Sequence, residues 1–276
     1  MNFIELIKYL FLGFIQGITE PIPVASSGHL LIAKTLLERF TGDIKIDFDL
    51  LAVITNFGSL IAIVIIFWKD IISLFRDFFG YIKTKENKYK ENFKYSLLVV
   101  VATIPAGIVG LIVTKLDIFA ALEENVKFVG VMLLVTAVFL FLIRNIKGIK
   151  KKEDITLKDA IVIGLFQVIA LFPGISRSGA TIVGGMTRKL TREAAFKFSF
   201  ILYIPISLAT MVLGISDLLS ANLTSAEWIY YLSSMIIAGI FTFIATKWFR
   251  KIVEQGKLIY IVLYCVILGS LVILFV

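Results

Sequence analysis

Long stretches without charged side chains are the dominant pattern along this chain. Five of them are 19 residues long and cover residues 50–68, 95–113, 198–216, 228–246 and 258–276, and residues 128–143 form a sixth stretch of 16. A helix that crosses the hydrocarbon core of a bilayer needs about 17–25 predominantly apolar residues. The pattern therefore predicts an all-α, polytopic membrane protein with six transmembrane helices.

Two further apolar stretches, residues 3–37 and 160–190, are interrupted near their middles. Glu20, Pro21 and Pro23 break the first stretch, and Pro173 and Gly174 break the second. Proline removes a backbone donor and ends a helix, and each remaining half is too short to cross a bilayer alone. We expect each stretch to form a re-entrant helical hairpin, which turns at mid-depth and leaves on the side where it entered.

The basic residues indicate how the predicted spans are oriented. Lys and Arg number 7 in residues 69–94, 6 in 144–158, 4 in 186–197 and 4 in 247–257, against 2 in 38–49, 2 in 114–127 and none in 217–227. Cytoplasmic loops of membrane proteins carry an excess of Lys and Arg. The counts predict that the four connections rich in Lys and Arg are cytoplasmic and that both termini lie outside. They also predict that the two hairpins enter from opposite faces.

Short repeats divide the chain in the same way. Gly13 and Gln16 recur as Gly164 and Gln167, 151 residues later, and the pair Ser27-Gly28 recurs as Ser178-Gly179 at the same separation. Each half would then be one hairpin plus three spans, and an odd number of spans inverts the second half relative to the first. We expect one membrane domain, 1–276, with inverted-topology repeats at about 1–143 and 159–276, an architecture typical of a binding site at the membrane midplane.

Composition and charge narrow the classes of function. Hydrophobic residues make up 59% of the chain and charged residues only 17%, which is far from the balance of a soluble domain. The net charge of +8 resides in short loops beside the spans, so it indicates topology and not nucleic-acid binding. Cys265 is the only cysteine, which excludes a disulfide framework and a cysteine metal cluster.

The two breaks carry the candidate chemistry. Ser26 and Ser176 each precede a helical run, the position of an N-cap, so two helix N-termini would point into one polar pocket. Free N–H groups and the positive end of the helix dipole favour an anion there. Arg177 adds a planar fork suited to phosphate oxygens. The pattern therefore predicts a phosphate site.

Ionisable groups at bilayer depth are costly and usually functional, which makes Glu20, His29 and Arg177 candidate catalytic residues. His29 is the only histidine of the chain, and histidine is the residue type that most often transfers protons. Structural roles remain open for several of these groups. Arg177 and Glu20 could form a buried ion pair alone, and Ser27, Ser178 and Thr181 could satisfy carbonyls or allow close helix packing.

The two motifs resemble those of the undecaprenyl-diphosphate phosphatases of the bacitracin-resistance type. The first family motif matches Gln16, Glu20 and the segment from Pro23 to His29, with Ala25 where the family usually has serine. The second matches the segment from Pro173 to Thr181 without a mismatch. The resemblance covers essentially the whole chain.

The resemblance implies hydrolysis of a C55 polyprenyl diphosphate to the monophosphate and phosphate. That reaction recycles the lipid carrier for cell-wall synthesis and confers bacitracin resistance. It further implies a divalent cation, Mg²⁺ or Ca²⁺, held by Gln16 and Glu20, and a bacterial cell-membrane location with the site open to the external face. Catalytic roles are expected for Glu20, Ser26, His29 and Arg177. Substrate-binding roles are expected for Ser27, Gly28, Gly174, Ser176, Ser178, Gly179 and Thr181.

Several questions stay open at this point. Ser26 is a candidate nucleophile with His29 or Glu20 as its base, and a water nucleophile is equally allowed. A phosphohistidine mechanism is excluded because it needs a second histidine. A lipid-carrier flippase or transporter with the same diphosphate site is the main alternative from another class. The expected partners are the lipid substrate and membrane lipids, without nucleic acid, and a homodimer is left open.

Overall fold

The computed structural model describes residues 2–42, 46–116, 118–119, 122 and 124–275. Val276, at the end of the last predicted span, and parts of the two connections at 38–49 and 114–127 lie outside these residues. In the described part the chain forms eleven α-helices and one 3-10 turn, and no β-strand. The all-α class predicted from the sequence is confirmed.

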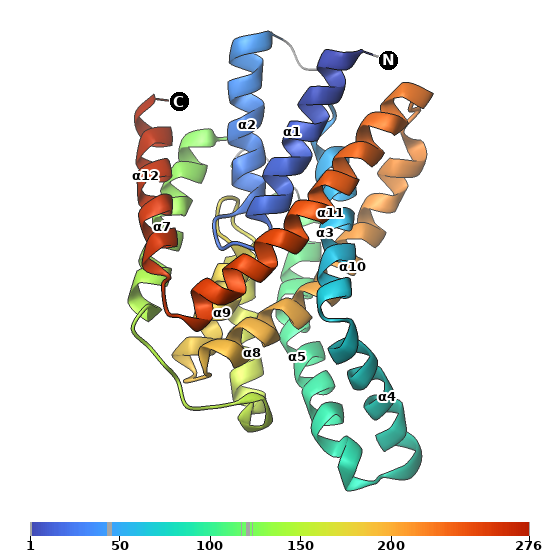
Figure 1. The fold of residues 1–276 in the computed structure, drawn as a ribbon, viewed down its shortest axis with the longest axis vertical. Helices are drawn as coiled ribbons and strands as arrows, with labels where there is room; N and C mark the ends of the chain where they lie inside the picture. The colour runs from blue at the N-terminus through green and yellow to red at the C-terminus, as the bar shows by residue number, and fades with distance from the viewer. Residues whose placement is uncertain (1, 43–45, 117, 120–121, 123, 276) are drawn as a thin grey trace.

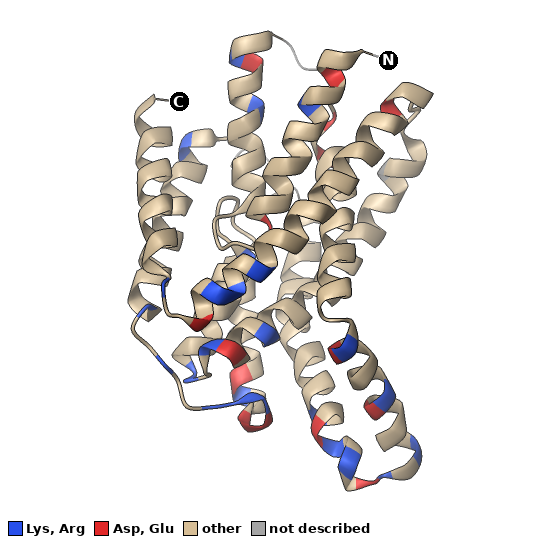
Figure 2. Ribbon diagram, in the orientation of Figure 1, with Lys and Arg blue, Asp and Glu red and all other residues tan. Residues whose placement is uncertain are grey.

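The apolar stretches form long helices. They are α3 (Phe48–Ile66), α5 (Asn87–Lys115), α7 (Val126–Ile143), α10 (Arg192–Ser220), α11 (Ser225–Glu254) and α12 (Ile259–Phe275). The first five are long and apolar enough to cross a membrane, and α12 is an uncharged helix of 17 residues. The protein is therefore a polytopic membrane protein. Figure 2 shows few charged residues along the middle of the bundle and many at the end opposite the two termini.

The stretch at 69–94 differs from the expected basic loop. The first predicted span, residues 50–68, ends at Ile66, and the chain bends at Phe67 into a separate helix, α4 (Trp68–Thr84). Helix α5 begins at Asn87, before its apolar stretch, and its first turns form a helical hairpin with α4. Figure 1 shows the hairpin projecting from the end of the bundle that lies opposite the termini.

Both interrupted stretches form pairs of short helices. The first pair is α1 (Phe3–Thr19) and α2 (Ser26–Thr41), and the second is α8 (Leu157–Ile169) and α9 (Arg177–Thr187). Figure 1 shows the two connections between these short helices near mid-height of the bundle, one blue and one yellow. The four short helices have 17, 16, 13 and 11 residues, and none of them is among the helices that are long and apolar enough to cross a membrane.

Two glycines explain how the short helices pack. Helix α1 runs along α11, and α8 runs along α5. A Cβ atom at Gly13 would lie 2.4 Å from the carbonyl oxygen of Ser234, and one at Gly164 would lie 2.7 Å from that of Ala102. Small residues at such crossings allow helix backbones to approach closely in a membrane. The two repeated glycines therefore do the same work, each against a long helix from the other half of the sequence.

Candidate active site at the two helix breaks

The first break positions Ser26 by an unexpected route. The prolines end α1, and residues 20–25 turn back so that α2 starts at Ser26. Ala25, not Ser26, occupies the N-cap position, with a left-handed φ of 63° and no side-chain cap bond. The prediction that Ser26 caps α2 is therefore wrong. Because the left-handed turn places Ser26 inside the helix, its hydroxyl is available for another partner.

The second break follows the predicted chemistry. Gly174 has a φ of 89°, a conformation that favours glycine, and it turns the chain after Pro173. Ser176 is the N-cap of α9, and its Oγ accepts a hydrogen bond of 3.2 Å from the backbone N–H of Gly179. The cap fixes Arg177 as the first residue of the helix.

The two breaks touch each other. A Cβ atom at Gly28 would lie 3.5 Å from the Cα atom of Gly174, and one at Gly179 would lie 3.0 Å from the Cβ atom of Pro23. These contacts link residues that are more than 140 positions apart in the chain. The N-terminal ends of α2 and α9 therefore meet at one place, as the sequence predicted.

A carboxylate stands at the centre of this meeting point. Glu20 Oε1 accepts a charge-assisted hydrogen bond from Arg177 Nη2. Its other oxygen, Oε2, accepts one of 2.5 Å from Ser26 Oγ and one of 2.9 Å from Gln16 Nε2. The Glu20 side chain is 8% exposed and that of Arg177 24% exposed, so the pair is largely shielded from solvent. A hydroxyl bonded directly to a carboxylate is the arrangement that an activated serine requires.

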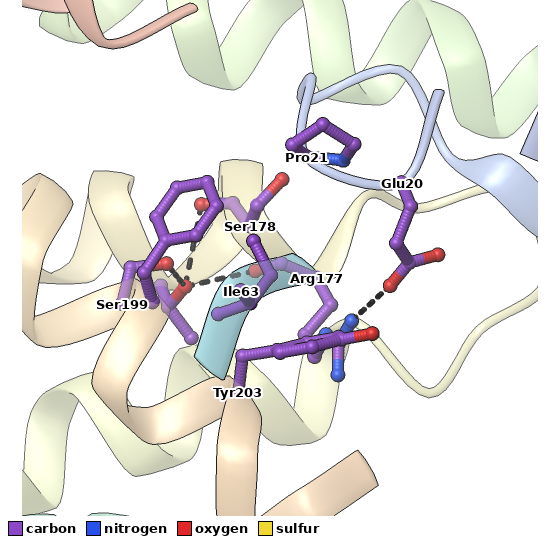
Figure 3. Close-up of a pocket in the computed structure, with 9 residues that line it drawn as sticks. Glu20, Pro21, Ile63, Arg177, Ser178, Ser199 and Tyr203 are labelled. Carbon is purple, nitrogen blue, oxygen red and sulfur yellow. Dashed lines mark hydrogen bonds and ion pairs between the residues drawn. The ribbon is translucent and has the colours of Figure 1, made fainter. Parts of the chain in front are cut away.

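Helix α10 holds the guanidinium from the other side. The Arg177 guanidinium lies over the ring of Tyr203, 4.0 Å from its centroid, and Nη1 donates to Ser207 Oγ at 3.3 Å. The Tyr203 hydroxyl in turn donates to Asn56 Oδ1 at 2.7 Å. Figure 3 shows the Tyr203 ring beneath Arg177, with Glu20 on the far side of the guanidinium. Arg177 is therefore oriented by three groups before any ligand binds.

Sequence reasoning missed this support. Tyr203 and Ser207 belong to an apolar helix that gives no motif, and Asn56 lies in a mostly apolar run of α3. The available signal was a buried tyrosine and a serine that flank Pro205 in a membrane helix, where polar side chains usually find a partner.

Three cavities border the cluster. The one that contains the break residues has a volume of about 260 Å³. Its polar lining is Gln16, Glu20, Ser26, Ser27, Asn56, Ser176, Arg177, Ser178 and Thr210. A cavity of about 10 Å³, enough for one water, lies behind Arg177 (Figure 3). A third, of about 460 Å³, shares Ser27, Leu30, Ala52 and Ala170 with the first and leads outward past Lys34, Asp49 and Glu124.

Several predicted site residues lie at the edge of this cluster or outside it. His29 is buried, and its ring nitrogens lie 2.9 Å from the carbonyl oxygen of Ala25 and 2.7 Å from the hydroxyl of Tyr264 on α12. It makes no hydrogen bond to Glu20 or Ser26 among the described contacts. Thr181 pairs with Ser199 Oγ at 2.6 Å, and both line the small cavity beside Arg177 and not the main one. The glycines at positions 174 and 179 serve the packing of the two breaks, and Gly28 also borders the outer cavity.

The donor set bears on the expected cation. In the part of the chain that the structure describes, no three His, Cys, Asp or Glu side chains are grouped to hold a metal ion. Of the described residues that line the main cavity, Glu20 is the one with a carboxylate. Mg²⁺ is commonly held by one or two carboxylates together with substrate phosphates. The residues present fit a cation that is bound jointly with a diphosphate.

These features define a class of protein: a polytopic membrane protein with a buried polar site, in which a serine, a carboxylate and an arginine meet at two helix N-termini. The model of the family described as bacitracin resistance protein BacA matches residues 9–271. The chain belongs to this family of membrane undecaprenyl-diphosphatases.

Curated relatives match over their full length. The chain is 42% identical over 275 residues to undecaprenyl-diphosphatase 1 of Bacillus licheniformis, which covers 100% of both chains. It is 40% identical to the undecaprenyl-diphosphatase of Oceanobacillus iheyensis, over 99% of this chain and 98% of the relative. It is 43% identical to undecaprenyl-diphosphatase 1 of Halalkalibacterium halodurans, over 97% and 95% of the two chains.

Proposed function

We propose that this chain hydrolyses undecaprenyl diphosphate to undecaprenyl phosphate and inorganic phosphate in the cavity at the two helix breaks. Such a reaction would return the lipid carrier to cell-wall synthesis and oppose bacitracin. The observation that carries the proposal is the joint hydrogen bonding of Ser26 and Arg177 to the two oxygens of Glu20. The decisive experiment is phosphate release from undecaprenyl diphosphate by the purified protein in detergent. No release by the wild-type protein would refute the proposal.

The diphosphate is bound by backbone and guanidinium groups. The N-terminal ends of α2 and α9 offer N–H groups to an anion, and Arg177 offers its fork of N–H donors. Because Tyr203, Ser207 and Glu20 already orient the guanidinium, little reorganisation is needed as charge develops on the distal phosphate. Such preorganised donors are worth the most in the transition state.

Ser26 is the nucleophile in the version that the geometry favours. Its Oγ attacks the distal phosphorus while Glu20 accepts the hydroxyl proton over the 2.5 Å hydrogen bond, and undecaprenyl phosphate leaves. Glu20 passes this proton to the departing undecaprenyl phosphate and is ionised again. It then takes a proton from the water that attacks the phosphoserine and returns it to Ser26 Oγ, which releases inorganic phosphate. The geometry favours Glu20 over His29 as the base, since both nitrogens of His29 are bonded elsewhere. A phosphoserine trapped at Ser26 would support this route, and its absence with full Ser26→Ala activity would favour direct attack by water.

A divalent cation, Mg²⁺ or Ca²⁺, would be held by Gln16 and Glu20 together with the substrate. When bound, it would neutralise charge on the phosphate oxygens. The apolar residues of the outer cavity would contact the first isoprene units of the lipid. These residues include Leu31, Val129 and Phe172.

Topology forms a second part of the proposal. We infer six transmembrane helices and two re-entrant hairpins in inverted repeats, with both termini and the site opening outside. The equivalent packing of Gly13 and Gly164 against α11 and α5 supports the repeat. The concentration of basic residues at the end away from the termini supports the orientation (Figure 2). Labelling of cysteines introduced at Thr84 and at Thr41 with a membrane-impermeant reagent in intact cells tests it, since only the second should react.

A flippase function is the alternative from another class, and a homodimer is compatible with both. Hydrolysis in detergent requires no membrane to cross, so it separates catalysis from transport. Movement of lipid phosphate across vesicles by a catalytically inactive Arg177→Ala variant would favour the flippase.

A further inference from the structure

Helix α4 exposes a continuous apolar stripe. Its large side chains are Trp68, Ile72, Phe75, Phe79 and Ile82, which are 56%, 48%, 61%, 62% and 49% exposed. The alternating spacing of four and three residues places all five on one face of the helix. Scattered apolar residues are normal on a protein surface, but a contiguous stripe of this kind marks an interaction surface.

The opposite face of α4 is already occupied. Asp77 accepts a hydrogen bond of 2.5 Å from Asn92 of α5, and the ring of Phe78 lies 5.2 Å from that of Phe93. The stripe therefore points away from the partner helix. Helix α4 also differs from a membrane span, because five of its 17 residues are charged.

The basic and acidic residues of α4 lie on different sides of the helix. Lys69, Arg76 and Lys83 recur every seven residues and run along one edge of the stripe. The two acidic residues belong to the occupied side, since Asp70 pairs with Lys197 at 2.6 Å and Asp77 binds Asn92. An apolar face bordered by bases is the pattern of a helix that lies in a membrane interface and contacts anionic headgroups.

The position of α4 in the chain agrees with this pattern. It follows directly on the membrane helix α3 after the bend at Phe67, and it begins with Trp68, a residue type enriched at membrane interfaces. Figure 2 shows that the hairpin of α4 and α5 lies at the end of the bundle where the basic residues gather.

We propose that α4 is an interfacial helix, seated with its stripe in the acyl–headgroup boundary and with Lys69, Arg76 and Lys83 on anionic lipid headgroups. A second copy of the chain fits less well. In a coiled coil built on this stripe, the three bases would occupy e positions, which usually form salt bridges with acidic residues at g positions of the partner helix. The g positions here carry Ile71 and Phe78. Among the described residues, Arg76 is the one base of the three with an acidic partner, Asp77 at 2.8 Å. Anionic lipid supplies partners for Lys69 and Lys83 as well, whereas a homodimer places no acidic residue opposite them.

The test uses the full-length chain with Cys265→Ala, so that a single introduced cysteine carries a bimane probe. The stripe variant is Phe79→Cys, and the matched control is Lys88→Cys, because both positions are well exposed: residue Phe79 is 62% exposed and the Lys88 side chain 61%. Each protein is reconstituted in phosphatidylcholine vesicles with and without phosphatidylglycerol. Quenching by aqueous iodide and by nitroxide-labelled lipid is then compared.

With phosphatidylglycerol present, iodide should quench the Phe79→Cys probe at least about fivefold less than the Lys88→Cys probe, and the nitroxide lipid should quench it strongly. Adding Lys69→Gln, Arg76→Gln and Lys83→Gln should weaken the dependence on phosphatidylglycerol by about fivefold for each base removed. The control set Lys85→Gln, Lys90→Gln and Lys94→Gln removes the same charge from elsewhere on the hairpin. It should change iodide access at position 79 by less than about twofold.

Three results would overturn the proposal. Equal iodide access at positions 79 and 88 would mean that the stripe faces water. Protection from iodide without quenching by nitroxide lipid would mean that a second copy or another protein covers it. Protection of position 79 from iodide that changes neither with phosphatidylglycerol nor with removal of the three bases would exclude anionic lipid as the partner.

Discussion

The two helix breaks correspond position by position at a separation of 151 residues, yet their side chains differ where chemistry is expected. The N-cap position holds Ala25 in the first break and Ser176 in the second, and the next position holds Ser26 and Arg177. Ser176 uses its hydroxyl to cap its helix. Ala25 leaves α2 without a side-chain cap, and Ser26 bonds Glu20 instead.

The glutamines that precede the breaks differ in the same sense. Gln16 donates to Glu20, which lies one turn further along the chain. Gln167 is the counterpart of Gln16, but the position that corresponds to Glu20 is Leu171. Both amide atoms of Gln167 are buried and have no hydrogen-bond partner among the described residues. The two breaks therefore supply two similar helix N-termini, while their unequal side chains place the hydroxyl–carboxylate pair at one break and the guanidinium at the other.

Arg177→Ala should have the largest effect on this division. It removes the donor that we propose binds the phosphate and leaves Glu20 buried without its cation, so kcat/KM should fall by at least about 10²-fold. Phosphate release in detergent measures the loss. Substantial activity in the purified variant would contradict the assignment of the second break to phosphate binding.

Arg188→Ala is the matched control for that loss. Arg188 is the C-cap residue of α9 and pairs at 2.8 Å with Asp159, away from the cavity. Burial would raise the pKa of Asp159, but hydrogen bonds from Lys150, Thr156 and Arg188 outweigh it and bring the pKa to about 2. Removing one of these donors should destabilise the fold by about 1–3 kcal/mol while turnover stays near normal. A lower melting temperature with intact activity is the expected result.

Ser26→Ala is next in expected size. Loss of the hydroxyl that donates to Glu20 should lower kcat by about 10²-fold or more without lowering the melting temperature, because α2 does not depend on this hydroxyl for its cap. Mass spectrometry of the acid-quenched wild-type enzyme should find phosphate on Ser26. Near-normal turnover of the variant would exclude the covalent route.

Much of this arrangement could be read from the sequence, because it depends on local rules. Uncharged runs predicted the long helices, and prolines predicted both breaks. The nearness of Glu20, Ser26 and Arg177 followed from the motifs and the repeat. The cap at Ser176 was also predicted correctly.

Other features depended on information that the local sequence does not carry. The cap at Ser26 was predicted wrongly because a left-handed alanine is rare and overrides the usual preference for serine. Tyr203, Ser207 and the turn of His29 toward Tyr264 arise from contacts between distant helices. Helix α4 was missed because its charges make it look like a loop when only membrane spans are sought.

His29→Asn should have a smaller effect than Ser26→Ala. His29 bonds the carbonyl of Ala25 and the hydroxyl of Tyr264, so we expect it to hold the turn before Ser26 and not to transfer a proton. The variant should lose about tenfold in kcat, with the shape of the pH–rate profile unchanged. Tyr264→Phe should reproduce part of this loss. Disappearance of one limb of the pH profile in His29→Asn would instead show that His29 is the acid or base.

Among the substitutions at the two breaks, Ser176→Ala should have the smallest effect on turnover. It tests the comparison most directly, since it leaves the second helix without a side-chain cap, like the first. The Ser176 hydroxyl accepts from the Gly179 N–H, and loss of such a cap costs about 1 kcal/mol of stability. Turnover should fall by less than about tenfold, because Arg177 keeps its contacts with Glu20, Tyr203 and Ser207. Ser176→Ala should lower the melting temperature more than Ser26→Ala does. Ser26→Ala should lower the rate of phosphate release more than Ser176→Ala does. If Ser176→Ala loses as much activity as Ser26→Ala at unchanged stability, then both breaks supply reactive hydroxyls and the division between them is wrong.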